Sequence, residues 1–420
     1  MCNACIWVLV PQVETDDPNI AYYYEYESSI AEYTRAFAAL SIAWTWCPVT
    51  LRSFREQLDR IAAVNDGRQH IVFNLCDGDE VNGTPGISVI DYLEAKGLVY
   101  TGAERYFYDI TTSKIAMKEA FDRAGVRHAP WFAITDTSFT LNGQFAALPK
   151  PVIVKPAVSA GSLGLGVRNV VRTEEELYAV VKGLYNGYRG WQVGAGGFVA
   201  EAFIAGEEYT TFIVGNYRQP EAAVLYPPVE RRFHEALKEE ERFLSFDRLW
   251  EFYEGEGPVN DDEHFYNYHP VDAERGRSIN ELSWQAYVAL KGTGYGRIDI
   301  RRDKTTGTLY ILEVNAQCGL SEDENYSSIG AILRYAGEPY SEMCRKVIRE
   351  TLGRRNDGND ESITAGYSGD GLLKRRRSCD ERSANRIFLE LVGYRPGRSP
   401  GCGASRSGCA RRMEELRESL

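Results

Sequence analysis

Polar and apolar residues alternate in two short segments late in the chain, at 296–300 (Gly-Arg-Ile-Asp-Ile) and 312–315 (Leu-Glu-Val-Asn). Alternation with a period of two is typical of a half-buried β-strand. The residues between them at 303–307, Asp-Lys-Thr-Thr-Gly, have the composition of a turn. The pattern therefore predicts a β-hairpin.

The polar faces of this hairpin carry candidate chemistry. Arg297 and Asp299 share one face of the first strand, because side chains two residues apart lie on the same side. Glu313 and Asn315 share one face of the second strand for the same reason. If the two faces coincide, Asp299, Glu313 and Asn315 form an all-oxygen cluster of the kind that Mg²⁺ prefers beside nucleotide phosphates. Arg297 would stand beside it, ready for developing negative charge. The alternative is a polar sheet face with a structural ion pair, and the hairpin alone does not separate the two.

The rest of the chain alternates predicted strands with predicted helices. In the first 105 residues, strands are expected at 5–10, 43–49 and 70–75, and helices at 28–40, 51–64 and 88–96. This alternation indicates an open parallel α/β sheet. The later pattern predicts strands at 131–134, 152–155, 198–203 and 208–214, and helices at 111–124, 174–183, 278–290 and 341–352.

Two stretches depart from this regular pattern. Residues 235–252 are dense in charged and aromatic side chains without a clean period, and they lie inside a long insertion at 227–272. A long loop inside a compact domain is often a lid. After residue 354, Gly, Ser and Arg dominate, with a Lys-Arg-Arg-Arg run at 374–377. That composition predicts a flexible tail over 355–420.

Composition narrows the class of protein. A chain of 420 residues is long enough for two or three domains. Its formal charge of -12 argues against general binding to nucleic acids or anionic membranes. No apolar run approaches the ~20 residues that a membrane-spanning helix needs. Nine scattered cysteines suit reduced thiols, so we expect a cytoplasmic protein.

A glycine-rich segment follows the strand predicted at 152–155. This strand ends in Lys155, and residues 159–167 are Ser-Ala-Gly-Ser-Leu-Gly-Leu-Gly-Val. Glycines such as Gly161 and Gly164 let backbone N–H groups approach phosphate oxygens, and Lys155 supplies a cation. No Gly-Lys-Ser/Thr follows, so the segment is not a Walker A loop, and a tight hairpin is the alternative.

In this order and spacing, the segments together resemble the ATP-grasp superfamily and, within it, the D-alanine–D-alanine ligases, over about residues 5–352. The resemblance is carried by Tyr100-Thr101-Gly102-Ala103, Ser113-Lys114 with Lys118, residues 151–156, residues 201–204 with Glu208, and the two hairpin strands. It implies an α/β, three-domain ATP-grasp architecture. A doubly wound N-terminal α/β domain would cover 1–110, a central lid domain 111–205, and a C-terminal domain with the metal site 206–354.

The resemblance also implies a set of site residues. Those for ATP are Lys114, Lys155, Gly161, Ser162, Gly164, Glu201, Ala202, Phe203, Ile204, Glu208 and Arg242. The cationic side chains would contact phosphates, and the glycine loop would close over the γ-phosphate. Glu201 would accept a hydrogen bond from the adenine amino group, and Glu208 would hold the ribose hydroxyls. Asp299, Glu313 and Asn315 would hold two Mg²⁺ ions, with Mn²⁺ as a substitute.

The implied reaction has two steps. A substrate carboxylate attacks the γ-phosphate of ATP to give an acyl phosphate and ADP, and an amine then displaces phosphate to leave an amide. Arg297 is the candidate for the oxyanion of the second step, and Ser162 is a further catalytic candidate. Glu25, in Glu-Tyr-Glu-Ser-Ser at 25–29, echoes the glutamate that positions the first substrate's amino group in these ligases.

Three departures from the family pattern bear on the substrates. Arg242-Phe243 replaces a Lys-Tyr pair, so the tyrosine hydroxyl is lost. Glu324 stands where a serine would bind the second substrate's carboxylate, and it would repel a carboxylate but attract an ammonium. The alternative is that Glu324 and its acidic neighbours cap the next helix, near 327–335. The family's N-terminal Gly-Gly loop is missing, and 11–19 is acidic and contains proline.

We therefore predict an ATP-dependent carboxylate–amine ligase that joins amino acids or small peptides and releases ADP and phosphate. Arg297 and Glu324 are the candidate substrate-binding residues. The expected partners are a small-molecule carboxylate and a small-molecule amine, with no nucleic acid and no membrane, and homodimer formation is left open. The rivals are a true D-alanine–D-alanine ligase, a non-catalytic ATP-binding protein, and a carboxylate kinase that stops at the acyl phosphate.

Overall fold

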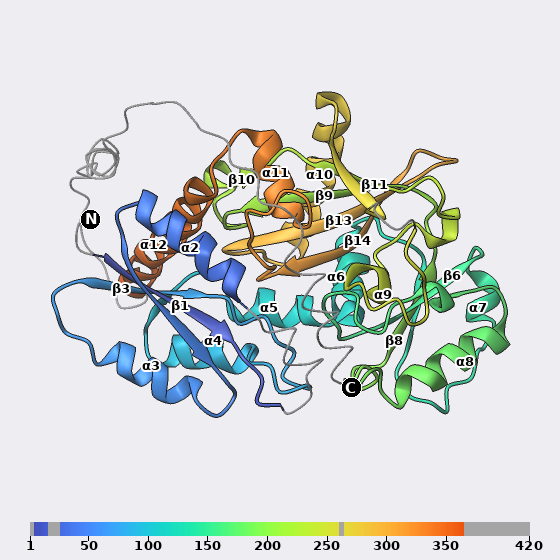
Figure 1. Cartoon of the computed structure of the whole chain (residues 1–420), viewed down its shortest axis with the longest axis horizontal. Helices are drawn as coiled ribbons and strands as arrows, with labels where there is room; N and C mark the ends of the chain where they lie inside the picture. Colours follow the sequence, from blue (N-terminus) through green and yellow to red (C-terminus); the bar gives the residue numbers. More distant parts are fainter. Residues whose placement is uncertain (1–3, 16–25, 260–263, 365–420) are drawn as a thin grey trace, which may run out of the picture. The chain divides into compact units, whose positions relative to one another are not determined.

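The computed structural model describes residues 4–15, 26–259 and 264–364, with side chains up to residue 354. Glu25 and residues 365–420 of the predicted tail lie outside the described residues. The last described helix, α12 (Tyr340–Thr364), continues past the predicted tail boundary at 354. The described strands form three β-sheets (Figure 1).

The first sheet is parallel, with the strand order β2-β1-β3-β4. Its strands are β1 (Ala4–Pro11), β2 (Ala43–Val49), β3 (Gln69–Asn74) and β4 (Val99–Tyr100). α3 (Phe54–Ala62) and α4 (Ile87–Ala95) pack on one face, and α2 (Glu27–Ala39) and α12 pack on the other. A strand covered on both faces reads as a continuous apolar run, as β1 does. The predicted parallel α/β sheet is confirmed.

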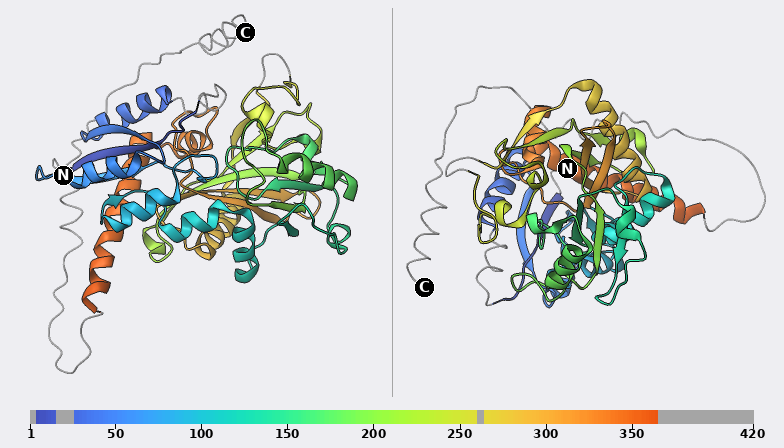
Figure 2. Two further views of the ribbon diagram at one scale, coloured as in Figure 1. Left: turned by 90° about the horizontal axis from the view of Figure 1, so that it is seen from below. Right: turned by 90° about the vertical axis from the view of Figure 1, so that its right-hand side faces the viewer.

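The second sheet is antiparallel, with the order β5-β8-β6-β7. Its strands are β5 (Trp131–Ile134), β6 (Val152–Pro156), β7 (Val170–Val171) and β8 (Phe198–Ala202), joined by α7 (Gln144–Ala147) and α8 (Glu174–Tyr185). The chain reaches this sheet through α5 (Arg105–Thr112) and α6 (Lys114–Ala124), which follow one another nearly in line (Figures 1 and 2). The helix predicted at 111–124 corresponds to α6, whereas α5 was not predicted. Ser113 separates the two helices, because its backbone is extended and its hydroxyl caps α6.

The third sheet is antiparallel, with the order β12-β11-β9-β13-β14 and β10 beside β9. Its strands are β9 (Gly206–Val214), β10 (Val224–Leu225), β11 (Val229–Phe233), β12 (Tyr266–Pro270), β13 (Tyr295–Asp303) and β14 (Leu309–Ala316), with helices α10 (Ala273–Ala289) and α11 (Ser328–Ala336). The stretch 227–272 is therefore not a loop throughout, because it supplies β11, β12 and the short α9 (Phe246–Leu249). The buried Arg231 occupies an inward position of β11, which hides the apolar period.

Candidate functional site

The predicted hairpin forms from β13 and β14. Arg297 lies opposite Asn315, and Asp299 lies opposite Glu313. Directly opposed residues of an antiparallel pair share a face, so the two polar faces coincide as predicted. The other face packs against α5, α6 and α10 through Ile298, Ile300, Ile311 and Val314. Burial of this apolar face therefore presents the polar face on the opposite side of the sheet.

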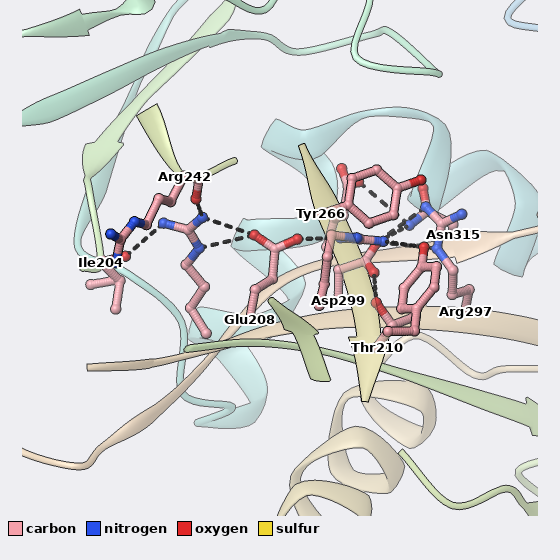
Figure 3. A network of polar contacts seen from close by, with 12 residues as sticks. Ile204, Glu208, Thr210, Arg242, Tyr266, Arg297, Asp299 and Asn315 are labelled. Atoms are coloured by element: carbon pink, nitrogen blue, oxygen red, sulfur yellow. Dashed lines mark hydrogen bonds and ion pairs between the residues drawn. The ribbon is translucent and has the colours of Figure 1, made fainter. Parts of the chain in front are cut away.

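Asp299 is the centre of a polar network on this face (Figure 3). It is 6% exposed. Its Oδ1 accepts a hydrogen bond from the hydroxyl of Thr210 on β9, at 2.8 Å. Its Oδ2 accepts from Nε of Arg297 and from Nδ2 of Asn315, each at 3.1 Å. The carboxylate is thus held in one orientation by donors from three neighbouring strands.

Glu313 is the second carboxylate of the cluster. Its Oε2 lies 3.5 Å from Nζ of Lys114, the first residue of α6. Burial alone would raise the pKa of Glu313, but the charges of Lys114, Lys155 and Arg297 outweigh burial and lower it. The Glu313 side chain therefore stays ionised at neutral pH and is available to a cation.

A second charged group joins α6 to the second sheet. Glu201 on β8 is 1% exposed and forms ion pairs with Lys118 of α6 and Lys155 of β6, the latter at 2.6 Å. Burial acts to raise the pKa of Glu201, but the two ammonium groups outweigh it and lower the pKa to about 2. Both carboxylate oxygens of Glu201 thus face lysines, and they hold Lys155 beside the cavity described below.

Replacement of Glu201 by glutamine is expected to lower the free energy of unfolding by about 3–5 kcal/mol, because two buried ammonium groups lose their shared counter-charge. The folded-state pKa of about 2 lies below the ordinary value of 4.5, so ionised Glu201 stabilises the fold above pH 4.5 and this contribution is lost as the pH falls towards 2. The difference between wild type and Glu201→Gln should therefore shrink over that interval. Urea unfolding across pH measures it, with Glu174→Gln, exposed on α8, as the control. A loss below about 1 kcal/mol at pH 7 would contradict the expectation.

Glu208, on β9, lies between two arginines (Figure 3). Its Oε2 accepts from Nε and Nη2 of Arg301 at 3.0 and 2.9 Å, and its Oε1 forms an ion pair with Arg231. Arg301 also donates to the carbonyl oxygen of Ile204, at 2.9 Å. Sequence reasoning missed both arginines. The signal for Arg301 was present, because Arg297, Asp299 and Arg301 continue one period-two row.

The glycine-rich segment 159–167 forms a loop with an unusual backbone. Gly161, Ser162 and Gly164 have φ angles of 56°, 61° and 76°. A positive φ is uncommon for a non-glycine residue, and at Ser162 it marks a backbone that the surroundings hold in place. The buried Asn169 donates to the carbonyl oxygen of Gly164 at 2.9 Å, and Trp250 Nε1 donates to that of Gly161 at 2.9 Å.

These groups surround a cavity of about 290 Å³, here called the first cavity. The predicted site residues that line it are Lys114, Lys155, Gly161, Ser162, Glu201, Ala202, Phe203, Ile204, Glu208, Arg297, Asp299, Glu313 and Asn315. A second cavity of about 550 Å³ lies against the first sheet and shares Arg297, Asn315, Gly319 and residues 159–161 with the first. The structure thus gathers residues from Val10 to Ser328, more than 300 positions apart in the sequence, around two adjoining cavities.

Three predicted site residues do not line either cavity. Gly164 lies inside the loop, where an added Cβ would stand 3.1 Å from the Pro156 side chain. The Arg242 guanidinium donates to the carbonyl oxygens of Leu237 and Glu235, at 3.0 and 3.1 Å, and these bonds close the loop 235–242. Glu324 lines neither cavity, and its Oε1 lies 3.5 Å from Nη1 of Arg334. Ser327 and Ser328 at the start of α11 line the cavity wall instead, because the acidic segment before them forms a turn on Asp323.

Among the described residues, no group of three or more His, Cys, Asp or Glu side chains is placed to hold a metal ion. A cation at the hairpin would therefore use two carboxylates together with the amide oxygen of Asn315. This donor set is all oxygen and carries two negative charges, which fits a hard cation such as Mg²⁺ and does not fit a thiolate- or imidazole-preferring metal. In the part of the chain that the structure describes, no helix is both long and apolar enough to span a membrane.

Comparison with known proteins places these features in a family. Residues 120–349, more than half of the chain, match the family model described as D-ala D-ala ligase C-terminus. D-Alanine–D-alanine ligase B of Xanthomonas campestris pv. campestris is 26% identical over 285 residues, covering 67% of this chain and 78% of that protein. The D-alanine–D-alanine ligase of Gluconobacter oxydans is 26% identical over 298 residues, covering 70% and 84%. The crystal structure of D-alanine–D-alanine ligase from Bacillus anthracis complexed with ATP shares the fold, with a TM-score of 0.60 at 20% identity over 84% of this chain and 99% of that one.

Proposed function

This chain belongs to the D-ala D-ala ligase C-terminus family and is an ATP-dependent carboxylate–amine ligase, and we propose that it joins two amino acids or short peptides through an acyl phosphate. One observation supports the proposal above the others. Two lysines, a glycine loop and an all-oxygen cluster beside Arg297 line the same cavity, and a second cavity opens onto Arg297. Such an arrangement suits a nucleotide in the first cavity and the ligated substrates in the second.

In this proposal the first cavity binds ATP. Lys114 and Lys155 contact its phosphates, and the backbone N–H groups of the 159–166 loop approach the γ-phosphate. The backbone of Ala202–Ile204 lies along the adenine. Glu208 faces the ribose in this proposal. Both of its oxygens are already paired with guanidinium groups, so Arg231 and Arg301 would share the contact with the ribose.

Asp299, Glu313 and Asn315 would hold Mg²⁺ in this proposal. A 180° rotation of the Asn315 amide, whose Nδ2 now faces Asp299, would present its oxygen to the ion. Bound Mg²⁺ neutralises phosphate charge during transfer. Arg297 keeps its charge at neutral pH, since Asp299 raises its pKa although burial acts to lower it.

The proposed reaction requires little covalent chemistry from the protein. An oxygen of the acid substrate bonds to the γ-phosphorus, the bond from that phosphorus to the bridging oxygen breaks, and ADP leaves. The amine nitrogen then bonds to the carbonyl carbon, and the tetrahedral intermediate expels phosphate and loses a proton to leave the amide. The chain holds the reactants in line and stabilises charge, and Arg297 faces the oxyanion of the intermediate.

A second candidate is D-alanine–D-alanine ligation itself, which the names of the relatives favour. ADP and phosphate release from Mg-ATP, screened with pools of amino acids, amines and small acids, tests both candidates. Release that needs two different substrates, with a condensation product of matching mass, supports the broader proposal. Full turnover with D-alanine alone supports the second candidate. ATP binding without release in any pool would contradict both.

Glu324→Ser is expected to change the relative kcat/KM for different amines by less than about twofold. The reason is that Glu324 lies outside both cavities and contacts Arg334. The amine profile of the variant, measured beside wild type with the acid substrate held constant, checks this. A shift of tenfold or more towards carboxylate-bearing amines would restore the role that the sequence suggested for Glu324.

A further inference from the structure

We propose that the acid substrate is an amino acid with a side chain larger than that of alanine, and that its ammonium group binds the carboxylate of Asp77 in the second cavity. This inference rests on the proposed function, because it names the substrate class of the same site.

Among the described residues of its segment, Asp77 is the acidic side chain that hydrogen-bonds only to its own backbone N–H. It follows β3 in the sequence Asp-Gly-Asp-Glu at 77–80. Asp79 accepts hydrogen bonds from the backbone N–H groups of Val81 and Asn82, and Glu80 accepts from those of Gly86 and Ser88. Those two carboxylates stabilise the loop through its backbone, whereas Asp77 lines the second cavity.

No basic side chain among the described residues acts on Asp77. Its side chain is exposed and lines the second cavity, and partial desolvation by the surrounding protein, with a smaller contribution from Asp79, raises its pKa to about 6. A carboxylate in this position gains more from a bound cation than one that already has a counter-charge. An ammonium group is the cation that an amino acid would bring.

Tyr33 forms part of the apolar wall of the second cavity. It lies on α2, is 1% exposed and lines the second cavity. Its ring contacts those of Phe37, Trp46, Phe73 and Tyr340, so it contributes an apolar surface to the cavity.

Charges of opposite sign face the second cavity. Arg297 and Asp77 both line this cavity, and both act on the buried thiol of Cys318. Burial raises the pKa of Cys318 most, Arg297 lowers it, and Asp299 and then Asp77 raise it. The two charged groups therefore flank one stretch of cavity wall. A zwitterion matches this arrangement, with its carboxylate on the side of Arg297 and the first cavity and its ammonium on the side of Asp77.

The size and walls of the second cavity indicate the side chain. Its volume of about 550 Å³ is in the range of pockets that hold drug-sized ligands, so it has room for an acid substrate larger than alanine beside the amine substrate. The apolar part of the wall comes from Val10, Tyr33, Trp46, Leu75, Tyr108 and Leu320. Aliphatic and aromatic groups gain from burial against such a surface. The structure thus favours a leucine-, phenylalanine- or tryptophan-like acid substrate.

Hydroxylamine in place of the amine substrate tests the acid site by itself, because it traps the acyl phosphate as a hydroxamate. The full-length protein is assayed with Mg-ATP and both enantiomers of alanine, leucine, phenylalanine and tryptophan. The desamino analogues 4-methylpentanoate, 3-phenylpropanoate and 3-indolepropanoate complete the panel. We expect at least one bulky amino acid to exceed alanine about tenfold in kcat/KM. We expect it to exceed its desamino analogue about 100-fold or more, since the analogue leaves Asp77 unpaired.

Asp77→Asn should lower kcat/KM for the preferred amino acid at least tenfold, mainly through KM. The KM for ATP should stay the same, and the rate with the desamino analogue should not fall. Asp59→Asn is the matched control, because Asp59 is exposed on α3 and pairs with Lys96 away from both cavities. Equal use of the desamino analogue, a preference for alanine, or an unchanged KM in Asp77→Asn would each overturn this inference while leaving the ligase intact. Hydroxamate from none of the acids would overturn the proposed function, and the inference with it.

Discussion

Asp299→Asn and Glu313→Gln should each lower kcat for ADP formation by about 10³-fold or more, equivalent to about 4 kcal/mol of transition-state stabilisation. Asp299 and Glu313 are the only two carboxylates among the described residues of the hairpin face that line the first cavity together with Asn315. If they hold Mg²⁺, the loss of either negative charge removes a ligand and weakens neutralisation of the phosphates. The amide replacements keep the side-chain volume, so the polar face should remain folded.

The measurement is ADP release as a function of Mg²⁺ concentration, with thermal unfolding of each variant as a check on folding. The variants should also need more Mg²⁺ for half-maximal rate. Glu274→Gln, in the exposed first turn of α10, is the control and should match wild type. Turnover within a few-fold of wild type in either test variant would contradict the metal assignment and favour a structural ion pair between Arg297 and Asp299.

Arg297→Lys should lower kcat by about 10²–10³-fold while changing the KM for ATP much less. Arg297 places Nε and Nη2 at 3.1 and 3.0 Å from the same oxygen of Asp299, a fork that a lysine does not reproduce. The charge is retained, so ground-state attraction of ATP should survive. The loss should fall on the step in which an oxyanion forms, where one positioned donor is worth about that factor.

The comparison of kcat with KM separates this role from general electrostatic attraction. Arg302→Lys is the matched control, because Arg302 lies on the same strand but pairs with Glu207 outside both cavities. A variant with an unchanged kcat and a KM for ATP raised tenfold or more would show that Arg297 serves binding rather than the transition state.

Local periodicity predicted the parts of this fold in which each residue's neighbours in sequence decide its environment. The hairpin was predicted because its polar and apolar residues alternate, and its strands β13 and β14 extend beyond the predicted bounds. β2 and β5 were predicted at the residues where they occur. Local periodicity did not predict the strands in which tertiary contacts bury polar residues. β11 carries Arg231 on its inward side, and its charge is compensated by Glu208 on the neighbouring strand. α6 was predicted at 111–124, with its start three residues too early, and α5 was not predicted.

The sequence by itself determined which residues share a face of each strand, and hence the composition of the oxygen cluster at the hairpin. It also determined the family, through an ordered set of lysines, glycines and carboxylates. Only the tertiary structure decided which charges meet. Glu201 lies between two lysines, Glu208 lies between two arginines, and Asp77 has no basic partner among the described residues. The reason is physical: periodicity follows from local backbone geometry, whereas the pairing of buried charges depends on strands and helices that are distant in sequence and meet only when the sheets assemble.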